Sequence, residues 1–230
     1  MSPSFSIASY NIRKAIGRDG KRNPARILDV ISSFAADIVV LQEADFRFGG
    51  RRPIFDPAAL REATGLRTVD VAPEVEGLGW HGNILMLGPD VTLDRVKTLT
   101  LQGLEPRGAV VADLSLLGQP LRLIHGHLGL IPHQRAHQAR ALGSEAALHA
   151  TVALGDFNAG GTRPNSLRGL SSAMQEVAHG PTFPTRWPLI RFDRMFHSGA
   201  ITAFDPEVID TPLSRIASDH LPIKARFRWT

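Results

Sequence analysis

The sequence has no cysteine among its 230 residues. Disulfide bonds, thiolate zinc sites and cysteine nucleophiles are therefore excluded. No uninterrupted apolar run approaches the ~20 residues that a membrane-spanning helix needs. The opening segment, Met1 to Ile7, has no basic stretch followed by an apolar one, so it does not resemble a secretion signal. We therefore expect a cytoplasmic protein without a transmembrane segment.

Flexible linkers rich in serine and glycine, low-complexity tracts and internal repeats are also absent. A chain of this length suits one large α/β domain or two small ones, and because no linker is visible we expect a single domain over residues 1–230. Hydrophobic residues make up 43% and charged residues 21%, as in ordinary soluble globular proteins. No feature of the sequence indicates an oligomeric state, so a monomer is the default expectation.

The net charge is +4, and nearly all of the basic residues are arginine, the better bidentate phosphate ligand. Basic residues gather in three segments that follow or flank predicted strand ends: Arg13, Lys14, Arg18, Lys21 and Arg22; Arg47, Arg51 and Arg52; Arg186, Arg191 and Arg194. If these strand ends converge, the positive charge surrounds one site and favours a polyanionic or phosphate-rich substrate. The alternative is that these are simply exposed polar loops.

Short apolar segments with the character of strands alternate with a smaller number of helical segments. The predicted strands are residues 5–10, 38–41, 83–87, 91–99, 109–116, 121–124 (running on to His127), 152–154, 192–196 and 221–229. Helices are predicted from Asn23-Pro24, from Asp56-Pro57 and over residues 132–149, while residues 160–190 have the composition of long loops. Hairpins mixed with helical crossovers fit two packed β-sheets with helices outside.

One feature recurs along the chain: a short apolar strand ends, and the next residues are carboxylates, amides or histidines. These residues are Asn11, Glu43, His127, Asp156 with Asn158, and Asp219 with His220. Binding sites in sheet proteins gather outside strand ends, where loops present side chains on a rigid frame. Each residue alone also fits a turn, a capped loop or a buried polar side chain, so only the joint pattern indicates a site.

The ordered motifs Tyr10-Asn11-Ile12, Leu41-Gln42-Glu43, His127-Leu128, Gly155-Asp156-Phe157-Asn158, Phe192-Asp193-Arg194 and Ser218-Asp219-His220-Leu221-Pro222 cover nearly the whole chain. Together they resemble the endonuclease/exonuclease/phosphatase superfamily. The resemblance implies a four-layer α/β sandwich, in which two packed mixed β-sheets are flanked by helices. It also implies a metal-dependent phosphoric ester hydrolase.

The resemblance assigns Glu43 as the principal carboxylate for Mg²⁺ or Mn²⁺, with Asn11 beside it and Asp219 on or near the metal. Magnesium prefers hard oxygen ligands and keeps several waters, so a site with few protein ligands fits. His220 is implied as a general base oriented by Asp193, although Asp156 is an equal candidate for the base.

By the same resemblance, Asp156 and Asn158 position the attacking water and a phosphate oxygen, and His127 donates to the phosphate as charge builds up. Four further residues are candidates for substrate binding. Arg13 lies two residues past Asn11, Arg107 precedes a predicted strand, and His81 and Asn83 belong to a segment similar to one that lines the family's pocket. For each of these, a structural or solvent-exposed role is an equal alternative.

Three functions remain open at this point. The first is a nuclease-like phosphodiesterase acting on nucleic acid or a nucleic-acid adduct, supported by the arginines and by Trp187 as a stacking surface. The second is a phosphatase or a sphingomyelinase-like esterase for a small or lipid phosphate, a branch that shares the His127-Leu128 signature. The third is a non-catalytic binding protein of the same fold, which the chemically competent motifs disfavour.

Overall fold

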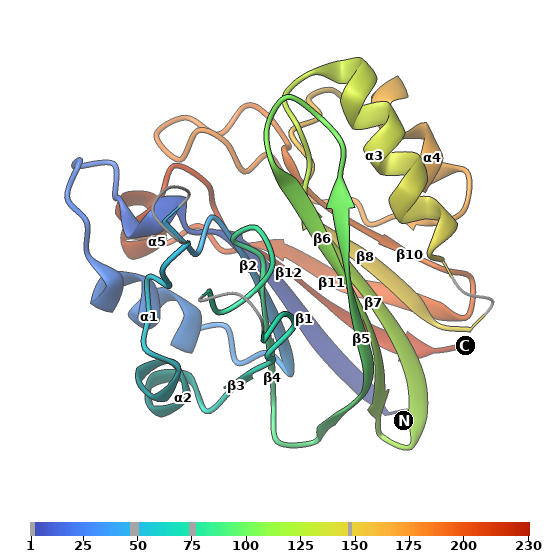
Figure 1. Ribbon diagram of the computed structural model, residues 1–230, viewed down its shortest axis with the longest axis horizontal. Helices are drawn as coiled ribbons and strands as arrows, with labels where there is room; N and C mark the ends of the chain where they lie inside the picture. The colour runs from blue at the N-terminus through green and yellow to red at the C-terminus, as the bar shows by residue number, and fades with distance from the viewer. Residues whose placement is uncertain (1–2, 47–50, 74–76, 147–148) are drawn as a thin grey trace.

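The computed structural model describes residues 3–46, 51–73, 77–146 and 149–230. Two mixed six-stranded sheets pack face to face, and helices cover both outer faces (Figure 1). The architecture is the predicted four-layer α/β sandwich. None of the helices in the described ranges is both long and apolar enough to cross a membrane.

The first sheet has the strand order β11-β12-β1-β2-β4-β3. Only β1 and β2 run parallel within it, and their ends align with Asn11 opposite Gln42. The remaining neighbours are antiparallel. The strands are β1 (Ser4–Asn11), β2 (Ile38–Gln42), β3 (Arg67–Thr68), β4 (Ile84–Leu87), β11 (Ile201–Val208) and β12 (Ile223–Trp229).

The second sheet has the order β5-β6-β7-β8-β10-β9 and repeats this plan. Its single parallel pair, β7 and β8, ends with His127 opposite Asp156. The strands are β5 (Val91–Leu101), β6 (Arg107–Leu116), β7 (Gln119–His127), β8 (Thr151–Asp156), β9 (Gln175–Glu176) and β10 (Asp193–His197). Each sheet thus carries polar residues at the ends of its parallel pair.

Helices α1 (Pro24–Ser32), α2 (Pro57–Thr64) and α5 (Pro212–Ala217) lie on the first sheet, and α3 (Pro132–Ser144) and α4 (Arg168–Ser171) on the second (Figure 1). Two 3-10 turns, η1 (Arg13–Ala15) and η2 (Asn165–Leu167), complete the structure. Helix α1 begins as predicted, because Asn23 accepts a hydrogen bond from the amide of Arg26 and Pro24 takes the first helical position. Its apolar stripe, which includes Ile27 and Ile31, packs on the outer face of β1 and β2.

The main core lies between the two sheets and consists of alternate residues of the facing strands, among them Ile7, Val40, Val110 and Leu154. Because side chains alternate across a strand, the same alternation carries Asn11 and Asp156 inward at the strand ends. The active-site candidates therefore sit on top of this core at one edge of the sandwich.

The structure differs from the sequence prediction in several places, and the short strands β3 and β9 are among the elements that were not predicted. Residues 201–217 form β11 and α5, although no element was predicted there. The helix predicted over residues 132–149 ends at Ser144, and residues 147–148 of that range lie outside the described residues, as does Arg47. These differences leave the predicted strand ends in place.

Candidate active site

The two sheets meet at Asn11 and Asp156, the last residues of β1 and β8. The Asn11 side-chain nitrogen donates to Oδ2 of Asp156 at 2.8 Å and lies 3.5 Å from Oε1 of Glu43. Asn11 and Asp156 are both almost fully buried. The oxygen of the Asn11 amide accepts a hydrogen bond from the main chain of Arg13. Asn11 thus orients two carboxylates from different sheets.

Asp193 and His220 form a buried pair across the same edge. Nδ1 of His220 lies 2.9 Å from Oδ2 of Asp193, and the hydroxyl of Thr182 donates to the same oxygen at 2.6 Å. The other ring nitrogen, Nε2, lies 3.7 Å from Oδ2 of Asp156. Burial opposes a charged ring, but Asp193 and Asp156 outweigh burial and raise the pKa of His220 to about 10.

His127 contacts Asp156 from the neighbouring strand, with Nε2 of the ring 3.2 Å from Oδ2 of the carboxylate. Burial lowers the pKa of His127 to about 4, although Asp156 acts in the opposite direction. At neutral pH the ring of His127 is therefore neutral, whereas that of His220 is protonated. Two histidines beside one carboxylate thus hold different charges, because His220 has a second carboxylate against it.

Gly155 allows β7 and β8 to approach closely at this point. Its φ of 144° suits glycine, and a Cβ there would lie 2.0 Å from the carbonyl oxygen of Gly126. Asn158 then adopts a left-handed conformation with a φ of 49°. Its main-chain amide donates to Oδ1 of Asp156, and its side chain donates to the carbonyl of Leu128. Asn158 holds the Asp156 loop in place through these two bonds.

Glu43 follows β2 in a left-handed conformation with a φ of 53°. Its Oε2 lies 2.5 Å from the ammonium of Lys14. Burial opposes the charge of this carboxyl, but its interactions with His127 and Lys14 lower the pKa of Glu43 to about 2. Asp219 is held in a comparable way, because Nε of Arg13 lies 3.2 Å from its Oδ2.

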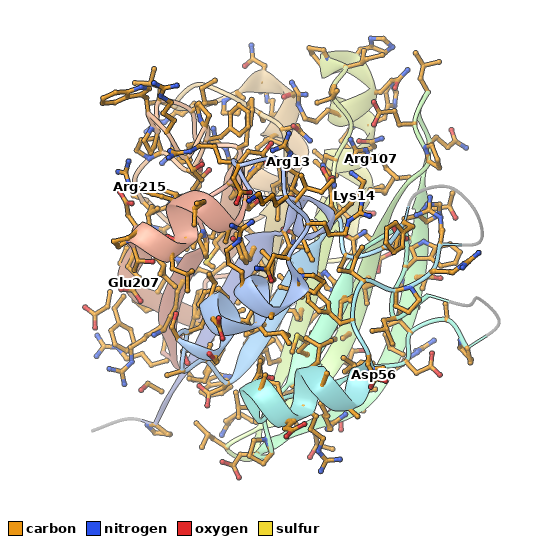
Figure 2. All side chains as sticks on the ribbon, turned by 90° about the vertical axis from the view of Figure 1, so that its left-hand side faces the viewer. Arg13, Lys14, Asp56, Arg107, Glu207 and Arg215 are labelled. Carbon is orange, nitrogen blue, oxygen red and sulfur yellow. The ribbon has the colours of Figure 1, made fainter. Side chains whose placement is uncertain are left out.

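Three of the predicted substrate-binding residues lie beside these groups. Arg107 and His81 line a narrow cavity together with Glu43 and His127, and Arg13 contacts Asp219. Arg107 is also paired with Glu105 at 2.7 Å. Figure 2 shows Arg13 and Arg107 in the upper half of the molecule, away from Asp56 near the bottom.

Asn83 is fully buried, and its side-chain nitrogen donates to the carbonyls of Trp80 and Gly108 at 2.8 and 3.0 Å. These bonds tie the segment before β4 to the start of β6. The structure therefore places Asn83 beneath the site, where it supports His81.

Arg194 does not belong to the predicted cationic rim. Strand alternation turns Asp193 inward and Arg194 to the outer face, where Arg194 is fully buried and pairs with Glu176. Its guanidinium also donates to the carbonyls of Ala159 and Gly161. Arg194 is a structural residue that ties β10 to the loop after Asp156.

Two residues at the site carried little signal in the sequence. Lys14 was counted only as part of a basic segment, although its position three residues after Asn11 places it at the same strand end. Thr182 lies in a region with the composition of a loop and has no motif around it. Its role follows only from the hydrogen bond to Asp193.

A sequence profile of the Endonuclease/Exonuclease/phosphatase family matches residues 8–220. The Escherichia coli (strain K12) protein YbhP is 25% identical over 256 residues, covering 96% of this chain and 95% of YbhP. The Bacteroides thetaiotaomicron mannosyl-6-phosphatase superposes with a TM-score of 0.77 at 18% identity, covering 98% of this chain and 100% of the other. D. rerio TDP2 complexed with a single-strand DNA product gives 0.71 at 19% identity, with coverages of 98% and 99%.

The chain belongs to the Endonuclease/Exonuclease/phosphatase family. Members of this family generally hydrolyse phosphoester bonds, typically with a divalent metal.

The side chains at the site fit such a metal by their chemistry. Glu43 and Asp219 offer hard carboxylate oxygens. Each contacts a basic side chain, Lys14 or Arg13, so both positions favour a positive charge. A second group, Asp156, Asp193 and His220, offers ligand atoms that all lie within 4.8 Å of one another. Both groups lie at the same edge, so a cation here would be held by carboxylates of this set.

Proposed function

We propose that this protein is a divalent-metal-dependent phosphodiesterase. The observation that carries the proposal is the convergence of strand ends from both sheets: Asn11 bonds Asp156, and His220 bonds Asp193, across the sandwich edge. Phosphate ester hydrolysis needs an activated water and neutralisation of charge on the phosphate. The carboxylates and histidines of this edge supply groups for both tasks.

In this proposal Asp156 is the general base. Both ring nitrogens of His220 face carboxylate oxygens, of Asp193 and Asp156, so the ring carries protons on both sides and donates. His220 then stabilises negative charge on the phosphate, held in orientation by Asp193. Asn158 and Asn11 keep the carboxylate of Asp156 in place to accept a proton from water.

The metal site of the proposal consists of Glu43 and Asp219, with Asn11 fixing the position of Glu43. A bound Mg²⁺ or Mn²⁺ would polarise a phosphate oxygen and neutralise its charge. His127, neutral at working pH, lies beside Asp156 and donates to the phosphate. Arg107 and His81 line the adjoining cavity and bind a further phosphate oxygen.

Hydrolysis of bis-p-nitrophenyl phosphate tests the proposal. We expect turnover with Mg²⁺ or Mn²⁺, none after chelation with EDTA, and recovery when the metal is restored. The substitution Asp156→Asn should lower kcat by on the order of 10²–10⁴-fold. Asp29→Asn, which changes an exposed carboxylate on α1, is the matched control and should leave kcat unchanged. A clean protein without turnover under either metal would make it a non-catalytic member of the fold.

For the substrate, we propose nucleic acid or a nucleic-acid adduct. A cavity of about 540 Å³ adjoins Asp219 and is lined by Trp187, Arg18 and Arg186. An exposed indole is a stacking surface for a base, and arginines bind the phosphates of the strand. The TDP2 structure with a single-strand DNA product supports a similar use of this fold.

A small or lipid phosphate is the second candidate, favoured by apolar side chains at the same edge. Leu104 and Leu189 are 79% and 81% exposed. Leu104 lies in the loop that joins β5 to β6, whose ends pair at Leu101 and Arg107, and Leu189 lies just before Asp193. A contiguous exposed apolar patch beside a site marks a surface that contacts lipid or another partner, and these two leucines are residues that would contribute to such a patch. The mannosyl-6-phosphatase shows that the fold also carries sugar phosphatases.

Parallel assays separate the two. Single-stranded DNA, RNA and phospholipid vesicles would be compared at several salt concentrations. Turnover of a polynucleotide that falls steeply with salt supports the nuclease, because phosphate contacts release counterions. Turnover of vesicles alone would remove the nuclease and support the lipid esterase.

A further inference from the structure

The segment after β1 places two cations on the two carboxylates of the candidate metal site. The ammonium of Lys14 lies 2.5 Å from Oε2 of Glu43, and Nε of Arg13 lies 3.2 Å from Oδ2 of Asp219. Figure 2 shows Arg13 and Lys14 close together in the upper half of the molecule. One short turn thus neutralises both carboxylates.

The backbone of this turn is unusual. Arg13, Lys14 and Ala15 have φ values of 47°, 54° and 58°, so three successive residues other than glycine adopt the left-handed conformation. Side chains with a Cβ disfavour this region, so the turn persists only because its surroundings hold it. The amide of Lys14 donates to the carbonyl of Glu43 at 3.0 Å, and the amide of Arg13 donates to Oδ1 of Asn11 at 3.0 Å.

Lys14 therefore contacts Glu43 twice, through the main chain and through the side chain. The main-chain hydrogen bond fixes the position of the Lys14 backbone, and the ammonium at the end of the side chain contacts the Glu43 carboxylate. The half-buried carboxylate of Glu43, which shares the Asn11 amide with Asp156, needs a counter-charge, because an unpaired buried charge is costly. Lysine supplies a compact charge on a flexible stem, so its ammonium can leave without moving the backbone.

We propose that Lys14 is the internal counter-cation of the candidate metal site. Its ammonium contacts Glu43, competes with a divalent cation for that carboxylate, and is displaced when the cation binds. The proposal rests on the proposed function for the location of the metal at Glu43. It adds that metal affinity is held down by a residue that is not itself a ligand.

Isothermal titration with Mn²⁺ tests the competition without any measurement of activity. Lys14→Met removes the charge and keeps the length of the side chain. Its Kd for Mn²⁺ should be tighter than that of the unmodified protein by about tenfold, because a cation next to a ligand opposes a second cation. Lys14→Arg, which keeps the charge, should bind nearly as weakly as the unmodified protein. Lys21→Met, which removes an exposed charge from the same segment, should change the Kd little.

A second measurement uses the unmodified protein and so does not depend on the folding of a variant. Acetylation of lysines would be followed by mass spectrometry with and without Mn²⁺. Labelling of Lys14 should increase several-fold with the metal, and that of Lys21 should not change. Equal or weaker Mn²⁺ binding by Lys14→Met, or unchanged labelling of Lys14, would overturn the competition and leave the phosphodiesterase intact. A protein that binds no Mn²⁺ at all would overturn both.

Discussion

Nδ1 of His220 lies 2.9 Å from Oδ2 of Asp193, so a histidine that precedes a strand of one sheet is oriented by an aspartate on a strand of the other. The bond fixes which ring nitrogen faces Asp156 and keeps the imidazole charged. An aspartate in this position orients the ring and stabilises its protonated form. The orientation is secured again by Thr182, which donates to the same carboxylate oxygen.

The substitution Asp193→Asn should therefore lower kcat for bis-p-nitrophenyl phosphate by on the order of 10²–10⁴-fold, with a smaller change in KM. Asparagine keeps the size of the side chain but loses the charge that holds His220 protonated. Thr182→Val, which removes only the supporting hydrogen bond, should reduce kcat far less. Equal kcat values for Asp193→Asn and the unmodified protein would show that His220 needs no orienting partner.

Trp187 is 69% exposed and lines the cavity next to Asp219. If a base stacks there, Trp187→Ala should raise KM for a short single-stranded oligonucleotide by about tenfold or more, since stacking contributes ~1–3 kcal/mol per base. The same variant should hydrolyse bis-p-nitrophenyl phosphate at the normal rate, and Trp187→Phe should restore much of the oligonucleotide affinity. Leu117→Ala, at an exposed residue in the turn between β6 and β7, is the control.

His125 is fully buried in β7, and neither ring nitrogen has a hydrogen-bond partner among the residues that the structure describes. Burial lowers its pKa from 6.5 to about 3. Below about pH 6.5 the unfolded chain therefore binds a proton that the folded protein does not. The free energy of unfolding should fall by about 1.4 kcal/mol per pH unit from this group until the pH nears 3.

The variant His125→Leu removes this pH-dependent contribution to the free energy of unfolding. Between pH 8 and pH 5 the unmodified protein should lose about 2 kcal/mol of its free energy of unfolding through this histidine, and His125→Leu should not lose this amount. Urea denaturation at the two pH values provides the measurement. His133→Gln, at an exposed position on α3, should show no such difference. An identical pH dependence in His125→Leu and the unmodified protein would mean that the ring is protonated or solvated in the fold.

Gly155 combines a φ of 144° with a carbonyl oxygen where a Cβ would sit. Gly155→Ala should destabilise the protein by more than about 3 kcal/mol, because strands β7 and β8 must separate to admit the methyl group. Gly118→Ala is the matched control. Its φ of 74° is also left-handed, but no atom lies within 4 Å of the added carbon, so the cost should be about 1 kcal/mol. Thermal or urea unfolding of the two variants would show whether the steric contact adds to the backbone strain.

Much of the fold was predictable, because apolar runs such as residues 38–41 end sharply at polar residues, here Gln42 and Glu43. Strand β11 was not, since Asp205 adopts a φ of 48° and Pro206 follows it, which breaks the alternation that marks a strand. The structure then pairs β11 with β12 across a register shift between Phe204 and Glu207. Tertiary pairing therefore formed a strand where the local pattern favours a turn.

Within the site, the order of the motifs identified the residues but not their contacts. The left-handed turn at Lys14 has no glycine or asparagine to indicate it, so the pairing with Glu43 could not be read from composition. The prediction that Arg194 belongs to the basic rim of the site was wrong, because Arg194 and Asp193 are neighbours in one strand and so face opposite sides of the sheet. Both cases depend on the direction of side chains, which spacing along the chain does not fix when the register is unknown.

Neither sheet holds a complete site, because Asn11 and His220 come from one layer while Asp156 and Asp193 come from the other. The catalytic activity of such a site would depend on how the two sheets pack against each other, and not only on each sheet being folded. A partly loosened state that keeps both hydrogen-bonded ladders but lets the layers slide would retain its far-ultraviolet dichroism and lose its turnover. The proposed turnover would thus be a sensitive measure of how well the two layers are ordered against each other.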